Sequence, residues 1–70
     1  MKKQEAYQSF AYHGERIYSP LGNKNLYHER MRLAWAFAYD TGLYKRLPND
    51  PIKADEAIER MLDEGKINIG

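Results

Sequence analysis

The stretch that decides the fold is Asn25–Tyr44, NLYHERMRLAWAFAYDTGLY. It is long enough for one helix and holds the only Trp and four other aromatic residues. A surface helix normally buries a single apolar stripe, whereas this segment carries apolar side chains on more than one face. Asn25 is placed to cap its amino end, and Asp40-Thr41-Gly42 supplies a stop, unless Gly42 is an interior glycine and the helix runs on to Tyr44. A chain of 70 residues has little else to cover two apolar faces, which indicates a partner.

Projection of this segment at about 100° per residue separates two sets of side chains. A core stripe is predicted at Leu26, Leu33, Phe37 and Tyr44, extended by Tyr27, Met31, Ala34 and Ala38. A second edge is predicted at His28, Arg32, Trp35 and Tyr39. Trp beside Arg, His and Tyr is the composition of a binding hot spot. The alternative is that the first helix or the tail covers Trp35 and leaves only its N–H near solvent.

Residues 51–64 are predicted to form another helix. Asp50 is its N-cap, and Pro51 stands at the first helical position, where a missing N–H does no harm. An apolar stripe runs along it at Ala54, Ala57, Ile58, Met61 and Leu62. Its acids are expected to be a solvated face: Asp55, Glu56, Glu59, Asp63 and Glu64. Gly65 should end the helix and Ile67 fold back on it, while residues 66–70 are expected to be extended or disordered.

The amino-terminal segment has two interpretations. Helix-forming residues favour a helix over about residues 3–13, with Gly14 as its carboxy-terminal stop. The rival is a β-hairpin of residues 7–12 and 15–19 that turns at His13-Gly14. The fold class predicted is therefore all-α, with three helices at about 3–13, 25–41 and 51–64 in a single domain 1–70, and the alternative is α+β with the hairpin followed by two helices.

Composition narrows the class of protein. Without Cys there is no disulfide and no thiolate metal site. No apolar run approaches the roughly 18 residues of a membrane span, and the amino terminus lacks the apolar region of a secretory signal, so we expect a cytoplasmic protein that binds no membrane. Residues 1–49 hold eight Lys or Arg and four acids, whereas residues 50–70 hold three and six. The two parts either attract each other and pack, or leave a basic, aromatic surface for a partner.

Catalytic patterns are weak, and we predict that the protein is not an enzyme. His28-Glu29 begins like a metalloprotease motif, but position 32 is Arg where the second His would stand. His13 and His28 have no obvious carboxylate cluster to complete a metal site. No nucleophile elbow and no phosphate-binding loop are present in the sequence. We therefore expect no catalytic residues, no metal and no cofactor.

One family resemblance follows from these residues. Arg32-Leu33-Ala34-Trp35-Ala36-Phe37-Ala38-Tyr39 resembles the R-x-x-W-x-x-G-[F/W] core of the small ribosome modulation factor-like proteins of bacteria and phages. The upstream Ala-to-Gly segment and Pro20 stand in roughly the family's order, although Ala38 replaces the family's Gly. The resemblance covers about residues 6–40. It implies a two-helix core with a Trp at its joint, and it implies ribosome binding only as an alternative function.

The function predicted from these features is that of a small regulatory or inhibitory protein of bacterial or phage type, which binds another protein. The binding surface is predicted at His28, Arg32, Trp35, Tyr39, Tyr44, Lys45 and Arg46. In this mechanism the amphipathic helix docks on an acidic or apolar groove, with Trp and Arg as anchors. Self-association as a homodimer through the same face is a further expectation. The alternative partner is RNA or the ribosome, with Lys and Arg at phosphates.

Overall fold

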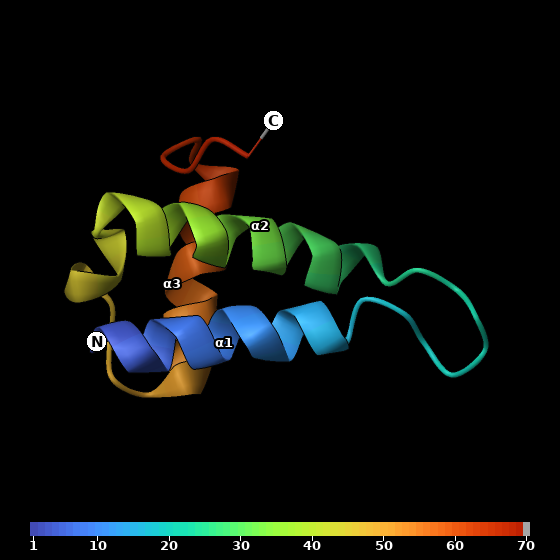
Figure 1. Ribbon diagram of the computed structural model, residues 1–70. Helices are drawn as coiled ribbons and strands as arrows, with labels where there is room; N and C mark the ends of the chain where they lie inside the picture. The colour runs from blue at the N-terminus through green and yellow to red at the C-terminus, as the bar shows by residue number, and fades with distance from the viewer. Residues whose placement is uncertain (70) are drawn as a thin grey trace.

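A computed structural model describes residues 1–69 of the chain (Figure 1). Its elements are α1 (Lys3–Glu15), α2 (Leu26–Thr41), the 3-10 helix η1 (Leu43–Arg46) and α3 (Pro51–Asp63). In Figure 1, α1 and α2 lie side by side and α3 crosses the pair. The prediction of a small all-α domain with three helices is confirmed. None of the helices described is both long and apolar enough to cross a membrane.

The ends of α2 and α3 follow the predicted capping chemistry. The Asn25 side-chain oxygen accepts hydrogen bonds from the backbone N–H groups of Tyr27 and His28, at 3.1 and 3.3 Å. Asp50 does the same for the N–H of Ile52 at 3.0 Å, and Pro51 occupies the first turn of α3. Gly42 ends α2 with a positive φ of 80°, so the interpretation of an interior glycine is wrong.

The amino-terminal hairpin is wrong, because α1 is continuous through the residues where the chain would have turned. The described residues 16–25 hold only an isolated antiparallel bridge between Tyr18 and Lys24. Gly14 is not the predicted stop either. The helix passes through it to Glu15, and a Cβ built on Gly14 would lie 3.4 Å from Cδ of Arg32. Gly14 therefore lies inside α1, beside the Arg32 side chain of α2.

The core face of α2 agrees only in part with the predicted stripe. The buried residues of α2 are Met31, Ala34, Trp35 and Ala38, so the prediction is confirmed for Met31, Ala34 and Ala38, and Tyr44 of η1 is buried as well. It is wrong for Leu26, which is 71% exposed, while Leu33 and Phe37 are only partly buried. Helices pack most closely where small residues face each other, and Ala34 and Ala38 lie in the core with Trp35 filling the space beside them.

The acidic part of the chain packs on the basic part, as one of the two interpretations of charge expected. Ala54, Ile58 and Leu62 of α3 join the core, and Arg30 of α2 pairs with Asp63 at 2.9 Å on the surface. Ile67 folds back as predicted and is buried. Of the tail 66–70, residues 66–69 are described, with the N–H of Lys66 bonded to the carbonyl of Met61 at 2.8 Å, and Gly70 lies outside the described residues.

Gly14 offers a test of this packing. Gly14→Ala is expected to raise the free energy of unfolding by about 0.5–1 kcal/mol, because it removes backbone freedom from a helical residue and its methyl group meets only the flexible Arg32 side chain. The matched change Gly42→Ala should lower stability by about 1–2 kcal/mol, because Gly42 has a positive φ. Urea unfolding of both variants measures the difference. Destabilisation by Gly14→Ala would contradict a helical Gly14.

Candidate functional site

The seven residues predicted as a binding surface do not form one exposed face. Trp35 is completely buried and Tyr44 is 8% exposed, so neither side chain is accessible to a partner. The prediction that these two residues contact a partner is therefore wrong. Lys45 and Arg46 are exposed, but they lie in η1, at the opposite end of α2 from His28. The alternative that other elements cover Trp35 is the one that the structure supports.

Arg32 and Tyr39 lie where α2 meets α1 and are half-buried. The guanidinium of Arg32 lies over the ring of Phe10, at 5.8 Å from its centroid. The Tyr39 ring is 6.2 Å from that of Tyr7 and stacks on that of Tyr44 at 6.1 Å. The edge that the projection separated from the core is thus mainly the interface with α1, which explains why α2 is apolar on two sides.

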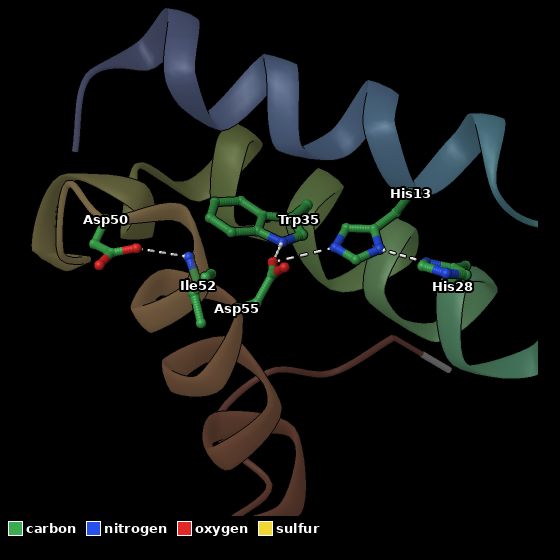
Figure 2. A network of polar contacts seen from close by, with 6 residues as sticks. All are labelled: His13, His28, Trp35, Asp50, Ile52 and Asp55. Carbon is green, nitrogen blue, oxygen red and sulfur yellow. Dashed lines mark hydrogen bonds and ion pairs between the residues drawn. The ribbon is translucent and has the colours of Figure 1, made fainter.

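Sequence reasoning missed a line of polar residues that crosses all three helices. Asp55 Oδ1 accepts a hydrogen bond from the Trp35 indole N–H at 2.8 Å. The same oxygen lies 3.1 Å from Nε2 of His13, whose Nδ1 lies 2.8 Å from Nδ1 of His28 (Figure 2). We call His28, His13, Asp55 and Trp35 the polar chain. Asp55 was predicted on the solvated face of its helix, and this is wrong, because its side chain is turned inward and only 27% exposed.

The hydrogen bonds within the polar chain determine which ring nitrogens of His13 and His28 carry protons. An ionised carboxylate only accepts, so Trp35 and His13 both donate to Asp55. Neutral His13 then carries its proton on Nε2, and its Nδ1 accepts from the Nδ1–H of His28. His13 is 1% exposed, and this arrangement satisfies both of its ring nitrogens. Two hydrogen bonds to one carboxylate thus tie α1 and α2 to α3.

A groove of about 510 Å³ lies between α1 and the start of α3. Its walls include Ser9, His13 and Asp55, three residue types that form hydrolytic triads elsewhere. His13 has no nitrogen left to activate Ser9, because one ring nitrogen is bonded to Asp55 and the other to His28. The residues that line the groove do not include His28. Among residues 1–69, no three His, Cys, Asp or Glu side chains converge on a common metal position.

The exposed apolar side chains of the described residues gather at the loop between α1 and α2. Seven large apolar or aromatic side chains are exposed, and five of them lie between Tyr12 and Tyr27. The most exposed are Leu21 at 87%, Leu26 at 71% and Tyr18 at 70%. From Arg16 to His28 the sequence contains Arg16 and Lys24 but no acid. We call Arg16, Tyr18, Leu21, Lys24 and Leu26 the loop surface.

Hydrogen bonds within the loop hold this surface in place. The Ser19 carbonyl accepts from the N–H of Gly22 at 3.0 Å, which closes a β-turn with Pro20 and Leu21 at its centre. The N–H of Ser19 donates to the carbonyl of Asn23 at 2.9 Å, and Gly22 adopts a φ of 82°. A turn followed by a left-handed glycine is a common hairpin connection. The N–H of Asn25 also bonds to the carbonyl of Ile17, so Leu21 stands at the tip of an ordered loop that projects beyond α3 (Figure 1).

Comparison of the chain with family models, curated proteins and solved structures finds no match. The resemblance to ribosome modulation factor-like proteins therefore stays a prediction.

The polar chain predicts that Asp55 is a stability residue. Asp55→Ala should lower the free energy of unfolding by about 2–4 kcal/mol, because it leaves two N–H donors, on Trp35 and His13, without an acceptor. Asp63→Ala is the matched control in the same helix and removes only the exposed pair with Arg30, which should cost less than about 1 kcal/mol. Urea titration followed by Trp35 fluorescence compares the two. Equal effects would contradict the role given to Asp55.

Proposed function

We propose that the protein is a small, non-enzymatic regulatory or inhibitory protein that acts by binding another protein through the loop surface. The observation that carries the proposal is the concentration of exposed apolar side chains on an ordered loop. Residues that pack in the core or between α1 and α2, such as Trp35 and Tyr44, are excluded from this site. Of the surface predicted from sequence, His28 follows Leu26 of the loop surface by two residues. The proposed bacterial or phage type rests on the family resemblance.

The chemistry of the loop surface favours an acidic partner with an apolar pocket. Leu21 and Leu26 would enter the pocket, and Arg16 would face a carboxylate at its rim. The ordered loop loses little conformational freedom on binding, which favours affinity. The mechanism would be occlusion of the partner's own binding groove.

The charges of the described residues make RNA the less favoured partner. Counterion release from phosphates drives nucleic-acid binding, and it needs several free cations on one face. The whole chain carries a net charge of only +1. Lys24 pairs with Glu29 at 2.6 Å and Arg30 pairs with Asp63, so two of the cations nearest the loop are already neutralised.

Site-specific photo-crosslinking tests the proposal. A photoreactive residue at position 21, in an otherwise natural chain, is expected to capture one protein from a nuclease-treated bacterial lysate. The matched control is position 52, because Ile52 is as exposed as Leu26, also lies in the first turn of a helix and is outside the loop between α1 and α2. Leu21→Ser with Leu26→Ser should abolish capture by a reporter at Tyr18, whereas Ile52→Ser should leave it unchanged.

The other outcomes each overturn the proposal. Equal capture at positions 21 and 52 would mean that the loop is no binding surface. Crosslinking of the chain to itself would identify a second copy as the occupant. Capture of RNA before nuclease treatment, with binding that falls by decades between about 50 and 200 mM salt, would identify a nucleic-acid partner.

A further inference from the structure

A hydrogen bond between two histidines closes the base of the loop. His13 lies in the last turn of α1 and His28 in the first turn of α2, so residues 16–25 form the connection that this pair spans. Their Nδ1 atoms are 2.8 Å apart. This side-chain hydrogen bond joins the carboxy-terminal end of α1 directly to the amino-terminal end of α2, at the two ends of the connecting loop.

Two tyrosines pack around the histidine pair. Tyr12 stands edge-on to the rings of His13 and His28, with centroids 5.1 and 5.9 Å away. Tyr27 stands edge-on to the same two rings, at 6.0 and 5.1 Å. We call Tyr12, His13, Tyr27 and His28 the ring cluster. Its tyrosines are half exposed, and the four residues stand at the two helix ends that the loop connects.

The hydrogen bond tolerates one added proton but not two. With both rings neutral, His28 donates from Nδ1 to Nδ1 of His13. A first proton can be held with the bond intact, either on Nε2 of His28 or on His13, which then donates to a His28 that carries its remaining proton on Nε2. With both rings protonated, two N–H groups and two positive charges face each other, and no acceptor remains between them.

The charged groups around the His13–His28 pair determine how much positive charge the two rings can hold. On α3, the Asp55 carboxylate accepts a hydrogen bond from His13 and favours the addition of a first proton to the histidine pair. Glu59, also on α3, faces Tyr27. From the end of α1, Arg16 lies over the ring of Tyr12, 5.6 Å from its centroid, and opposes positive charge on His28. On α2, Glu29 is turned toward Lys24. One carboxylate is therefore in direct contact with the pair, which balances one positive charge and leaves a second without a partner.

We propose that the His13–His28 pair is a proton-sensitive latch, which keeps the loop surface ordered with one proton or none and releases it when both rings are charged. The consequence for partner binding rests on the proposed function, in which the ordered loop is the binding surface. An acidic medium would then loosen the loop and weaken the complex, without unfolding α3.

The direction in which the pKa of His28 is shifted agrees with a latch that opens on protonation. Burial, followed by the neighbouring His13 and Arg16, lowers the pKa of His28 below its ordinary value of 6.5. A group whose pKa is lower in the closed state than in the open state stabilises the closed state fully above the ordinary value. That stabilisation is lost as the pH falls below 6.5 and through the lowered pKa.

NMR of the intact protein tests the latch. Between pH 8 and 4.5, the ring Cε1–H signal of His28 should report its protonation. This protonation should coincide with loss of the cross-strand contacts between Tyr18 and Lys24, while the amide signal of Ile58 in α3 stays in place. Because the readout needs no partner, a negative result would leave the binding proposal standing.

His28→Asn is the decisive variant. Its side-chain amide can either donate to or accept from Nδ1 of His13, and it takes up no proton. The contacts between Tyr18 and Lys24 should therefore persist to pH 4.5 in the variant. Loop opening at the same pH in the variant and the natural chain would overturn the proposal. Protonation of His28 in the natural chain with an unchanged loop would also overturn it.

Discussion

The structure depends on one carboxylate, Asp55, that accepts hydrogen bonds from Trp35 and His13 where three helices meet. A buried indole N–H needs an acceptor, and so does the N–H of a buried imidazole. One oxygen of Asp55 serves both, so α3 can cross α1 and α2 only where this carboxylate reaches them. The apolar contacts of Ala34, Ala38 and Ile58 supply the burial, while Asp55 fixes the position at which it occurs.

Capping chemistry made much of the fold predictable. Asn25, Asp50 and Gly42 act locally, through hydrogen bonds or a left-handed conformation within a few residues, so sequence alone places them. The same local reasoning failed at Gly14, because a glycine inside a helix looks like a helix stop in the sequence. It also failed at Asp55, which stands among acids at helical spacing and gives no local sign that it turns inward.

The candidate binding site in the structure differs from the site predicted from the sequence, because contacts between distant parts of the chain decide which residues are exposed. Trp35 and Tyr44 have the composition of a hot spot, and their burial is decided by α1 and α3, which are distant in sequence. Leu26 was expected in the core, yet it is 71% exposed, and Leu21 in the loop is 87% exposed. The signal that could have identified the loop surface is the run from Arg16 to His28, which contains apolar and basic residues and no acid. The ring cluster links this surface to the polar chain, so the interior and the loop share His13 and His28.

Hydrogen exchange of the Trp35 indole N–H tests the central claim most directly. If Asp55 holds this group inside the three-helix core, it exchanges only when the whole domain unfolds, and its protection matches that of the slowest backbone amides of α2. Exchange at the rate of a free indole would contradict the account, because Trp35 would then face solvent and the helices would be held together in some other way.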